Sequence, residues 1–217
     1  LRNKIYYAEG VMQSNGIVSL ISEECNPDII TISGTDYIAS EADLSELIGC
    51  SVNYFYKNDS GMKRILWAWE NDRNKTMKIK SDHLIQDSPK FTTINIVYRE
   101  NGKNREVKIH PYRNFIYNNS LYNDAPIEKL KPKSGWIKLV DNNGDNNYDT
   151  VIVEEFQNLF VNAIVLGAQS ISDYYNNSVD LREYDVVKII KNGKFIELSE
   201  VGNKVLLSCL EDKDKKK

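Results

Sequence analysis

Short segments rich in β-branched and aromatic residues, each bounded by turn residues, recur along much of this 217-residue chain. Ile, Val, Thr, Tyr, Phe and Trp suit a pleated, half-buried surface, whereas helical signals are few and short. The strand-like segments are residues 16–21, 29–33, 51–56, 64–69, 76–80, 91–98 and 105–109. The pattern predicts an all-β fold of small barrel- or sandwich-like modules with short helical connectors.

Local turn chemistry indicates how some of these segments pair. Residues 93–98 and 106–109 alternate apolar and polar side chains and flank Asn101-Gly102, the dipeptide favoured in two-residue hairpin turns. Residues 57–61 are expected to join a second hairpin through a longer loop. The helical connectors are predicted at residues 39–48 and 125–130.

Internal similarity makes two modules plausible, whereas length alone does not choose between one domain and two. A chain of 217 residues can form one large β domain or two small ones. The segment from Asp43-Leu44-Ser45-Glu46 to Asn58 resembles the segment from Asp180-Leu181-Arg182-Glu183 to Asn192, although chance similarity between β units explains this nearly as well. Because Asp87-Ser88-Pro89-Lys90 interrupts the strand pattern, we expect modules at residues 1–86 and 87–217. One interwoven domain is the alternative.

Charge and hydropathy narrow the classes of partner. Lys and Arg total 28 against 31 Asp and Glu, so the net charge of −3 provides no broad basic field for nucleic acid. No run approaches the roughly 18 apolar residues of a membrane-spanning helix. The three cysteines, Cys25, Cys50 and Cys209, are far apart and odd in number, which favours small buried side chains over a disulfide framework.

The most specific chemistry lies in the polar loop at residues 141–149, between apolar runs at 136–140 and 150–153. Oxygen-bearing side chains occupy its first, third, fifth and ninth places, and the seventh place adds a backbone carbonyl. These candidate calcium ligands are Asp141, Asn143, Asp145, Asp149 and, through its carbonyl, Asn147. Hard cations prefer such oxygen donors. The alternative is a solvated turn whose Asn and Asp side chains bond to their own backbone.

Two resemblances follow from these residues. The spacing of Asp141, Asn143, Asp145 and Asp149 within a β-hairpin resembles the calcium loops of FG-GAP repeats in integrin α-chain propellers, with Asn146 where Gly is usual. An EF-hand is disfavoured because its twelfth-place Glu is replaced and the flanks look like strands.

Residues 115–119, 130–145 and 148–153 look like a recurrent β segment of Firmicutes secreted and cell-surface proteins, often found beside S-layer homology modules. This second resemblance implies an extracellular setting and carries no catalytic residue.

Aromatic residues offer a second candidate site. Trp67 and Trp69 are two apart in one predicted strand and should project to the same face, and Tyr54 and Tyr56 should do so in the preceding strand. Such rings can stack on sugars, but a buried core face is the favoured explanation of the pattern. Surface exposure of Trp67 or Trp69 would reverse this preference.

Enzymatic signatures are missing from the sequence. It contains no Gly-x-Ser-x-Gly, Walker or dinucleotide-binding motif, and His83 and His110 stand outside any metal-ligand spacing. We expect a non-enzymatic structural or binding module of a bacterial extracellular or cell-surface protein, stabilised locally by calcium. The expected partners are neighbouring modules of a larger chain or assembly, and cell-wall polysaccharide. The alternatives are a structural protein of a phage virion or tail, and a glycan-binding accessory domain of a secreted wall-active enzyme.

Overall fold

The computed structural model describes residues 4–22, 25–38, 44–59, 61–156, 161–165, 170–175, 177–180, 182, 188–191 and 194–197. These residues are almost entirely strands joined by turns, which confirms the expected all-β class. The expected helix at residues 39–48 is described only as a 3-10 turn, η1 (Ser45–Leu47), and residues 127–130 form turns instead of a helix. No described helix is long and apolar enough to cross a bilayer.

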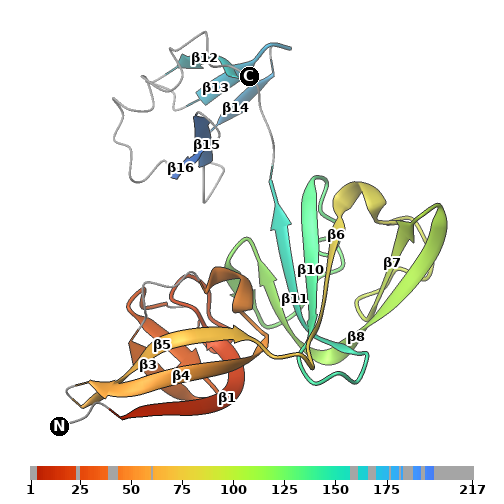
Figure 1. Ribbon diagram of the computed structural model, residues 1–217. Helices are drawn as coiled ribbons and strands as arrows, with labels where there is room; N and C mark the ends of the chain where they lie inside the picture. The colour runs from red at the N-terminus through yellow and green to blue at the C-terminus, as the bar shows by residue number, and fades with distance from the viewer. Residues whose placement is uncertain are drawn as a thin grey trace. The chain divides into compact units, whose positions relative to one another are not determined.

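The first five strands close a small barrel (Figure 1). They are β1 (Ile5–Ser14), β2 (Ile29–Ile32), β3 (Thr35–Ile38), β4 (Ser51–Asp59) and β5 (Met62–Glu70). The order around the barrel is β1-β2-β3-β5-β4, with a parallel bridge between Ile38 and Arg64 on one side and antiparallel β1–β4 pairing on the other. This order, with a short helical element between β3 and β4, is that of the five-stranded Greek-key barrel known as the OB fold.

Alternation along the strands fills the barrel. In β4, Val52 and Tyr54 face the core, while Asn53 and Phe55 face outward. Ile30, Ile32 and Ile65 are fully buried in the same cluster. Each fully buried aliphatic side chain contributes about 1.5–3 kcal/mol of stability.

The next strands form a second sheet. They are β6 (Lys75–Lys80), β7 (Asn95–Glu100), β8 (Lys103–Tyr117), β9 (Ser120–Tyr122), β10 (Gly135–Asp141) and β11 (Tyr148–Glu155), with the 3-10 turn η2 (Ser81–His83) after β6. The order is β6-β10-β11-β8-β7, and β9 pairs β8. Asn101 and Gly102 both have positive φ in the turn between β7 and β8, so the expected hairpin is confirmed. The antiparallel β10–β11 hairpin carries the polar loop.

The second sheet buries one face in its own core and part of the other face against the barrel. Ile137, Leu139 and Val151 lie in a core cluster of this sheet, whereas Val140 and Ile152, on the opposite face of the same strands, belong to the barrel cluster. Polar contacts follow the same interface. The Nζ of Lys138 lies 2.8 Å from Oε2 of Glu46. The side-chain Nδ2 of Asn142 donates to the backbone carbonyl of Gly49 at 3.0 Å. The barrel and the sheet therefore share an apolar interface.

The chain divides into two compact units, Leu1–Phe156 and Gln157–Lys217. The expected boundary at residue 87 falls inside the first of these units. Within that unit the change from barrel to sheet occurs earlier, between β5 and β6, because β6 pairs with β10 along Lys75 to Lys80.

The second unit contains a three-stranded antiparallel sheet and a hairpin. Its strands are β12 (Val161–Val165), β13 (Ser170–Asp173), β14 (Ser178–Asp180), β15 (Lys188–Lys191) and β16 (Lys194–Glu197). Their order matches that of the barrel: three strands paired in sequence, a 3-10 residue at Arg182, then a hairpin. Arg182 holds the place in the repeated Asp-Leu-x-Glu motif that Ser45, the first residue of η1, holds in the barrel.

Candidate functional site

The loop between β10 and β11 is organised around the carboxylate of Asp141, which is fully buried. Its Oδ1 accepts the N–H groups of Asn143 at 3.2 Å and Gly144 at 2.6 Å, and its Oδ2 accepts the N–H of Asn146 at 2.9 Å. Asn146 takes the left-handed backbone expected at the sixth place, with φ of 68°. A carboxylate that accepts three backbone N–H groups fixes the path of the turn.

The other candidate ligands continue this pattern. Asn143 Oδ1 accepts the N–H of Asp145 at 2.8 Å, and Asp145 Oδ1 accepts the N–H of Asn147 at 2.7 Å. Asp149 Oδ2 accepts the N–H of Asn142 at 3.0 Å, which ties the two ends of the loop together. The loop therefore supports its own conformation through side-chain to backbone bonds.

The loop also concentrates negative charge. Desolvation raises the pKa of Asp149, and the charges of Asp141 and Asp145 raise it further, against the lowering effects of the Asn142 N–H and His110. No group of three or more His, Cys, Asp and Glu side chains in the described residues is placed to hold a metal. The loop oxygens are nevertheless the hard donors that calcium prefers. Asp141 Oδ2, Asn143 Oδ1, Asp145 Oδ1 and Asp149 Oδ2 each accept one backbone N–H and keep a second lone pair, whereas Asp141 Oδ1 already accepts two.

A second candidate site lies on the outside of the barrel, on the neighbouring strands β1, β4 and β5 (Figure 1). We call it the aromatic face and define it by Tyr7, Phe55, Trp67 and Trp69, which are 53%, 40%, 60% and 36% exposed. Phe55 lies opposite both Tyr7 on β1 and Trp67 on β5. The Phe55 ring centroid is 5.6 Å from those of Tyr7 and Trp69, and 6.3 Å separates Tyr7 from Trp69.

The two tryptophans share one exposed face, as their spacing predicts, but they are not core residues as the favoured explanation required. The two tyrosines predicted to accompany them lie elsewhere. Tyr54 is buried in the barrel, where its hydroxyl lies 2.8 Å from that of Tyr37. Tyr56 packs against the barrel cluster and stacks on Tyr6 at 5.2 Å. Side chains of β4 alternate, so Phe55 between them points outward.

Tyr7 and Phe55 were missed from the sequence. Phe55 stands between two tyrosines, so both faces of β4 carry aromatic side chains. The sequence therefore does not show which face covers the core and which is exposed. Tyr7 belongs to β1, whose residues 5–14 were not among the predicted strands. The alternation of Tyr7, Glu9 and Val11 with Tyr6, Ala8 and Gly10 was the available signal.

Polar side chains border the aromatic face on one side. We call Glu9, Asn53, Asn71 and Arg73 the polar row. Glu9 lies opposite Asn53, which in turn lies opposite Trp69. The Tyr7 hydroxyl is 3.0 Å from Glu9 Oε1 and 2.9 Å from Asn53 Oδ1. Rings and hydrogen-bonding groups are therefore contiguous on this surface.

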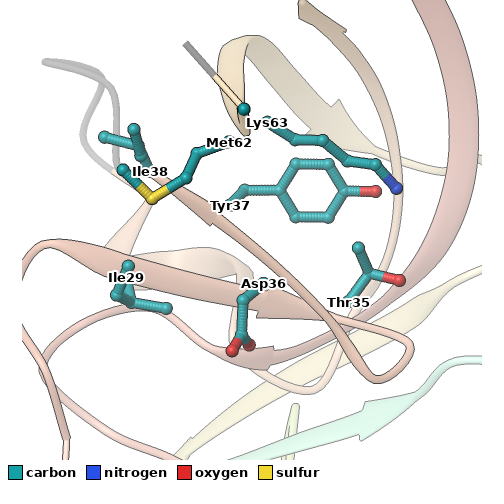
Figure 2. Close-up of a pocket in the computed structure, with 8 residues that line it drawn as sticks. Ile29, Thr35, Asp36, Tyr37, Ile38, Met62 and Lys63 are labelled. Atoms are coloured by element: carbon teal, nitrogen blue, oxygen red, sulfur yellow. The ribbon is translucent and has the colours of Figure 1, made fainter. Parts of the chain in front are cut away.

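A shallow pocket of about 250 Å³ lies at another part of the barrel, lined by β2, β3 and the start of β5 (Figure 2). Figure 2 shows the Lys63 side chain running beside the Tyr37 ring, and its Nζ is 5.7 Å from the ring centroid. Asp36 accepts a hydrogen bond from Thr31 at 2.8 Å. The charged groups of this pocket are thus already engaged, which makes it a weaker candidate than the aromatic face.

Comparison of the chain with known protein families and with curated proteins finds no match.

Proposed function

We propose that this chain is a non-catalytic binding module of a secreted or cell-surface bacterial protein, and that it binds polysaccharide on the aromatic face. The observation that carries the proposal is the exposure of Trp67 and Trp69 beside Tyr7 and Phe55. Contiguous exposed apolar surface is unfavourable in water and commonly marks a contact surface. The sequence pattern alone fits either a buried core face or a sugar-stacking surface, and exposure of Trp67 or Trp69 is the observation that distinguishes the two.

The chemistry of the surface favours a sugar as its occupant. A pyranose ring has an apolar face of C–H groups and an edge of hydroxyls, so it matches a surface on which aromatic rings adjoin polar side chains. The ring hydroxyl of Tyr7 and the amide of Asn53 supply such polar groups next to the rings. The net charge of −3 disfavours nucleic acid, which also stacks on aromatic rings.

We infer further that calcium stabilises the loop at residues 141–149. The support is the concentration of three carboxylates there and the raised pKa of Asp149, which a bound cation would reverse. Millimolar calcium should therefore raise the Tm of the full chain, and a chelator should lower it again. A Tm indifferent to both treatments would count against the calcium site.

The binding proposal is tested by calorimetry of the full chain with soluble oligosaccharides, and by co-sedimentation with peptidoglycan and wall polysaccharide. Trp67→Ala should weaken binding about tenfold or more, because a stacked ring contributes about 1–3 kcal/mol in aromatic recognition of flat ligands. Trp67 is 60% exposed, so its removal should leave the Tm nearly unchanged.

Tyr112→Ala is the matched control, because Tyr112 is 90% exposed on β8, away from the aromatic face. It should bind as the unaltered chain does. The proposal fails if the unaltered chain binds none of these polymers, or if Trp67→Ala and Tyr112→Ala bind equally well.

A further inference from the structure

The polar row is held in place before any ligand arrives. The amide nitrogen of Asn71 donates to Oδ1 of Asn53 at 3.0 Å, and Asn71 is largely buried. Oδ1 of Asn71 accepts the N–H and the Nε of Arg73 at 3.0 and 3.2 Å. Because each planar group orients the next, the row presents its outward atoms in a defined arrangement.

The row is also electrically balanced. Nη2 of Arg73 lies 2.9 Å from Oε2 of Glu9, and both side chains are substantially exposed. A ligand thus meets a paired carboxylate and guanidinium rather than a single charge. Among the hydrogen bonds of the described residues, none uses Nδ2 of Asn53 or Nη1 of Arg73. These two donors and the Glu9 carboxylate are the groups available to a ligand.

We propose that the polar row makes the aromatic face selective for uncharged polysaccharide, by binding the hydroxyl edge of a sugar ring whose C–H face lies on the aromatic rings. This inference rests on the proposed function. A hydroxyl both donates and accepts, so neighbouring hydroxyls can donate to Glu9 and accept from Asn53 or Arg73.

An anionic polymer fits the row less well. A ligand carboxylate or phosphate group offers no proton to Glu9 and is repelled by it, and the charge of Arg73 is already matched within the pair. Repulsion of the wrong ligand is a common source of specificity. Glu9 is therefore the residue that excludes anionic polymers, while Asn53 and Arg73 hold the neutral ones.

The test measures binding of the full chain to neutral oligosaccharides of glucose and of N-acetylglucosamine, and to polygalacturonate, at low and physiological salt. The unaltered chain should prefer a neutral ligand. Glu9→Gln keeps the size of the side chain but leaves Arg73 unbalanced, so polygalacturonate binding should strengthen about tenfold at low salt. The double variant Glu9→Gln with Arg73→Gln should lose that gain, because it restores the balance of charge.

Glu106→Gln is the matched control. Glu106 pairs with Lys90 at 2.6 Å on the second sheet, and the exposures of this pair, 45% and 69%, resemble the 46% and 64% of Glu9 and Arg73. It changes the net charge equally and should leave the preference unchanged. The Tm of each variant shows whether the fold is retained.

The outcomes separate the two proposals. If Trp67→Ala abolishes binding but Glu9→Gln behaves like Glu106→Gln, the polar row is not selective and the aromatic face remains the binding site. If the unaltered chain prefers polygalacturonate to the neutral ligands, the inference that the polar row selects uncharged polysaccharide is wrong, and the aromatic face remains the binding site. If the unaltered chain binds no polysaccharide, the proposed function itself fails.

Discussion

Asp149 is the residue of the polar loop whose pKa is shifted by desolvation and by the neighbouring carboxylates. Desolvation and the neighbouring Asp141 and Asp145 raise its folded-state pKa above 3.8. A raised carboxyl pKa contributes stability below the unfolded pKa, and that contribution is lost as pH rises through the folded pKa. At neutral pH without a cation, the ionised carboxylate is therefore a net cost to the fold.

Asp149→Asn should accordingly leave the Tm unchanged or raise it in the presence of a chelator, since Asn Oδ1 can still accept the Asn142 N–H. The same substitution should abolish any rise in Tm on adding calcium. Thermal unfolding at neutral pH with calcium or chelator measures both effects.

Asp87→Asn serves as the control, because Asp87 is exposed and lies outside the loop. If Asp149→Asn retains the full calcium response, Asp149 is not a ligand. A large loss of stability in chelator would instead mean that its charge supports the loop.

At single positions the sequence predicts backbone better than burial. Asn146 and the Asn101-Gly102 turn adopt the positive φ that their side chains favour, because this preference is local. The spacing of Trp67 and Trp69 gives a shared face for the same reason. The face of a strand that meets the core is set by distant strands. Because β4 carries aromatic residues on both of its faces, its sequence does not show that Tyr54 is buried, nor that the neighbouring tryptophans are exposed.

At the level of elements, the hairpins follow from local signals, but the partners of the strands do not. The β4–β5, β7–β8 and β10–β11 pairs join neighbours along the chain and are predicted by alternation and turn residues. The fifteen-residue β8 pairs antiparallel with β7 and parallel with β11. A parallel pairing has no local turn signature, so the partner of β8 on this side could not be predicted from the sequence.

The connection from η1 to β4 offers a prediction about how the barrel contacts the second sheet. Gly49 has φ of 78°, and a Cβ placed there would lie 2.8 to 2.9 Å from side-chain atoms of Thr150 on β11. Gly49→Ala therefore combines backbone strain with overpacking and should cost about 2–4 kcal/mol of unfolding free energy. Urea unfolding measures this loss.

Gly61→Ala isolates the contact from the strain. Gly61 has a similar φ of 92°, in the β4–β5 turn, but a Cβ there would meet nothing within 4 Å. This variant should lose only about 1–2 kcal/mol, the cost of left-handed backbone. Equal losses in the two variants would show that Gly49 and Thr150 are not in close contact.

For the molecule as a whole, a titratable group in the barrel core and a half-buried one packed against the core of the second sheet predict sensitivity to alkali. Burial, aided by Glu70, raises the pKa of Cys50 in the barrel from 9.0 to about 12. The pKa of Tyr117 in the second sheet is raised from 10.0 to about 12, chiefly by desolvation and secondly by the hydrogen bond to Glu155. The folded chain therefore holds more protons than the unfolded chain between about pH 9 and 12, and its stability falls as pH rises.

The Tm should accordingly drop by roughly 5 °C or more between pH 8 and pH 11, a size expected from a few kcal/mol in a chain of this length. Cys50→Ala should reduce the slope at the alkaline end, although it also costs packing at pH 8. A Tm that stays level to pH 11 would contradict the burial of these groups.

Strand-forming segments recur along much of the sequence, and this recurrence predicts the all-β class found in the described residues. It does not predict where compact units divide. The apolar residues Val140 and Ile152 join the second sheet to the barrel core, and this long-range contact, rather than the break at residues 87–90, sets the extent of the first unit. The repeated Asp-Leu-x-Glu motif was the sequence signal for the matching strand order of the second unit.

Strand β6 closes one margin of the second sheet and carries Lys75, Lys78 and Lys80 along its six residues. Lysines on an outermost strand oppose the docking of another chain's backbone, because the approaching strand would have to desolvate several ammonium groups. Copies of the chain crowded together would therefore resist fusing into continuous fibrils along this margin. They would stay separate, each with its aromatic face open to solvent.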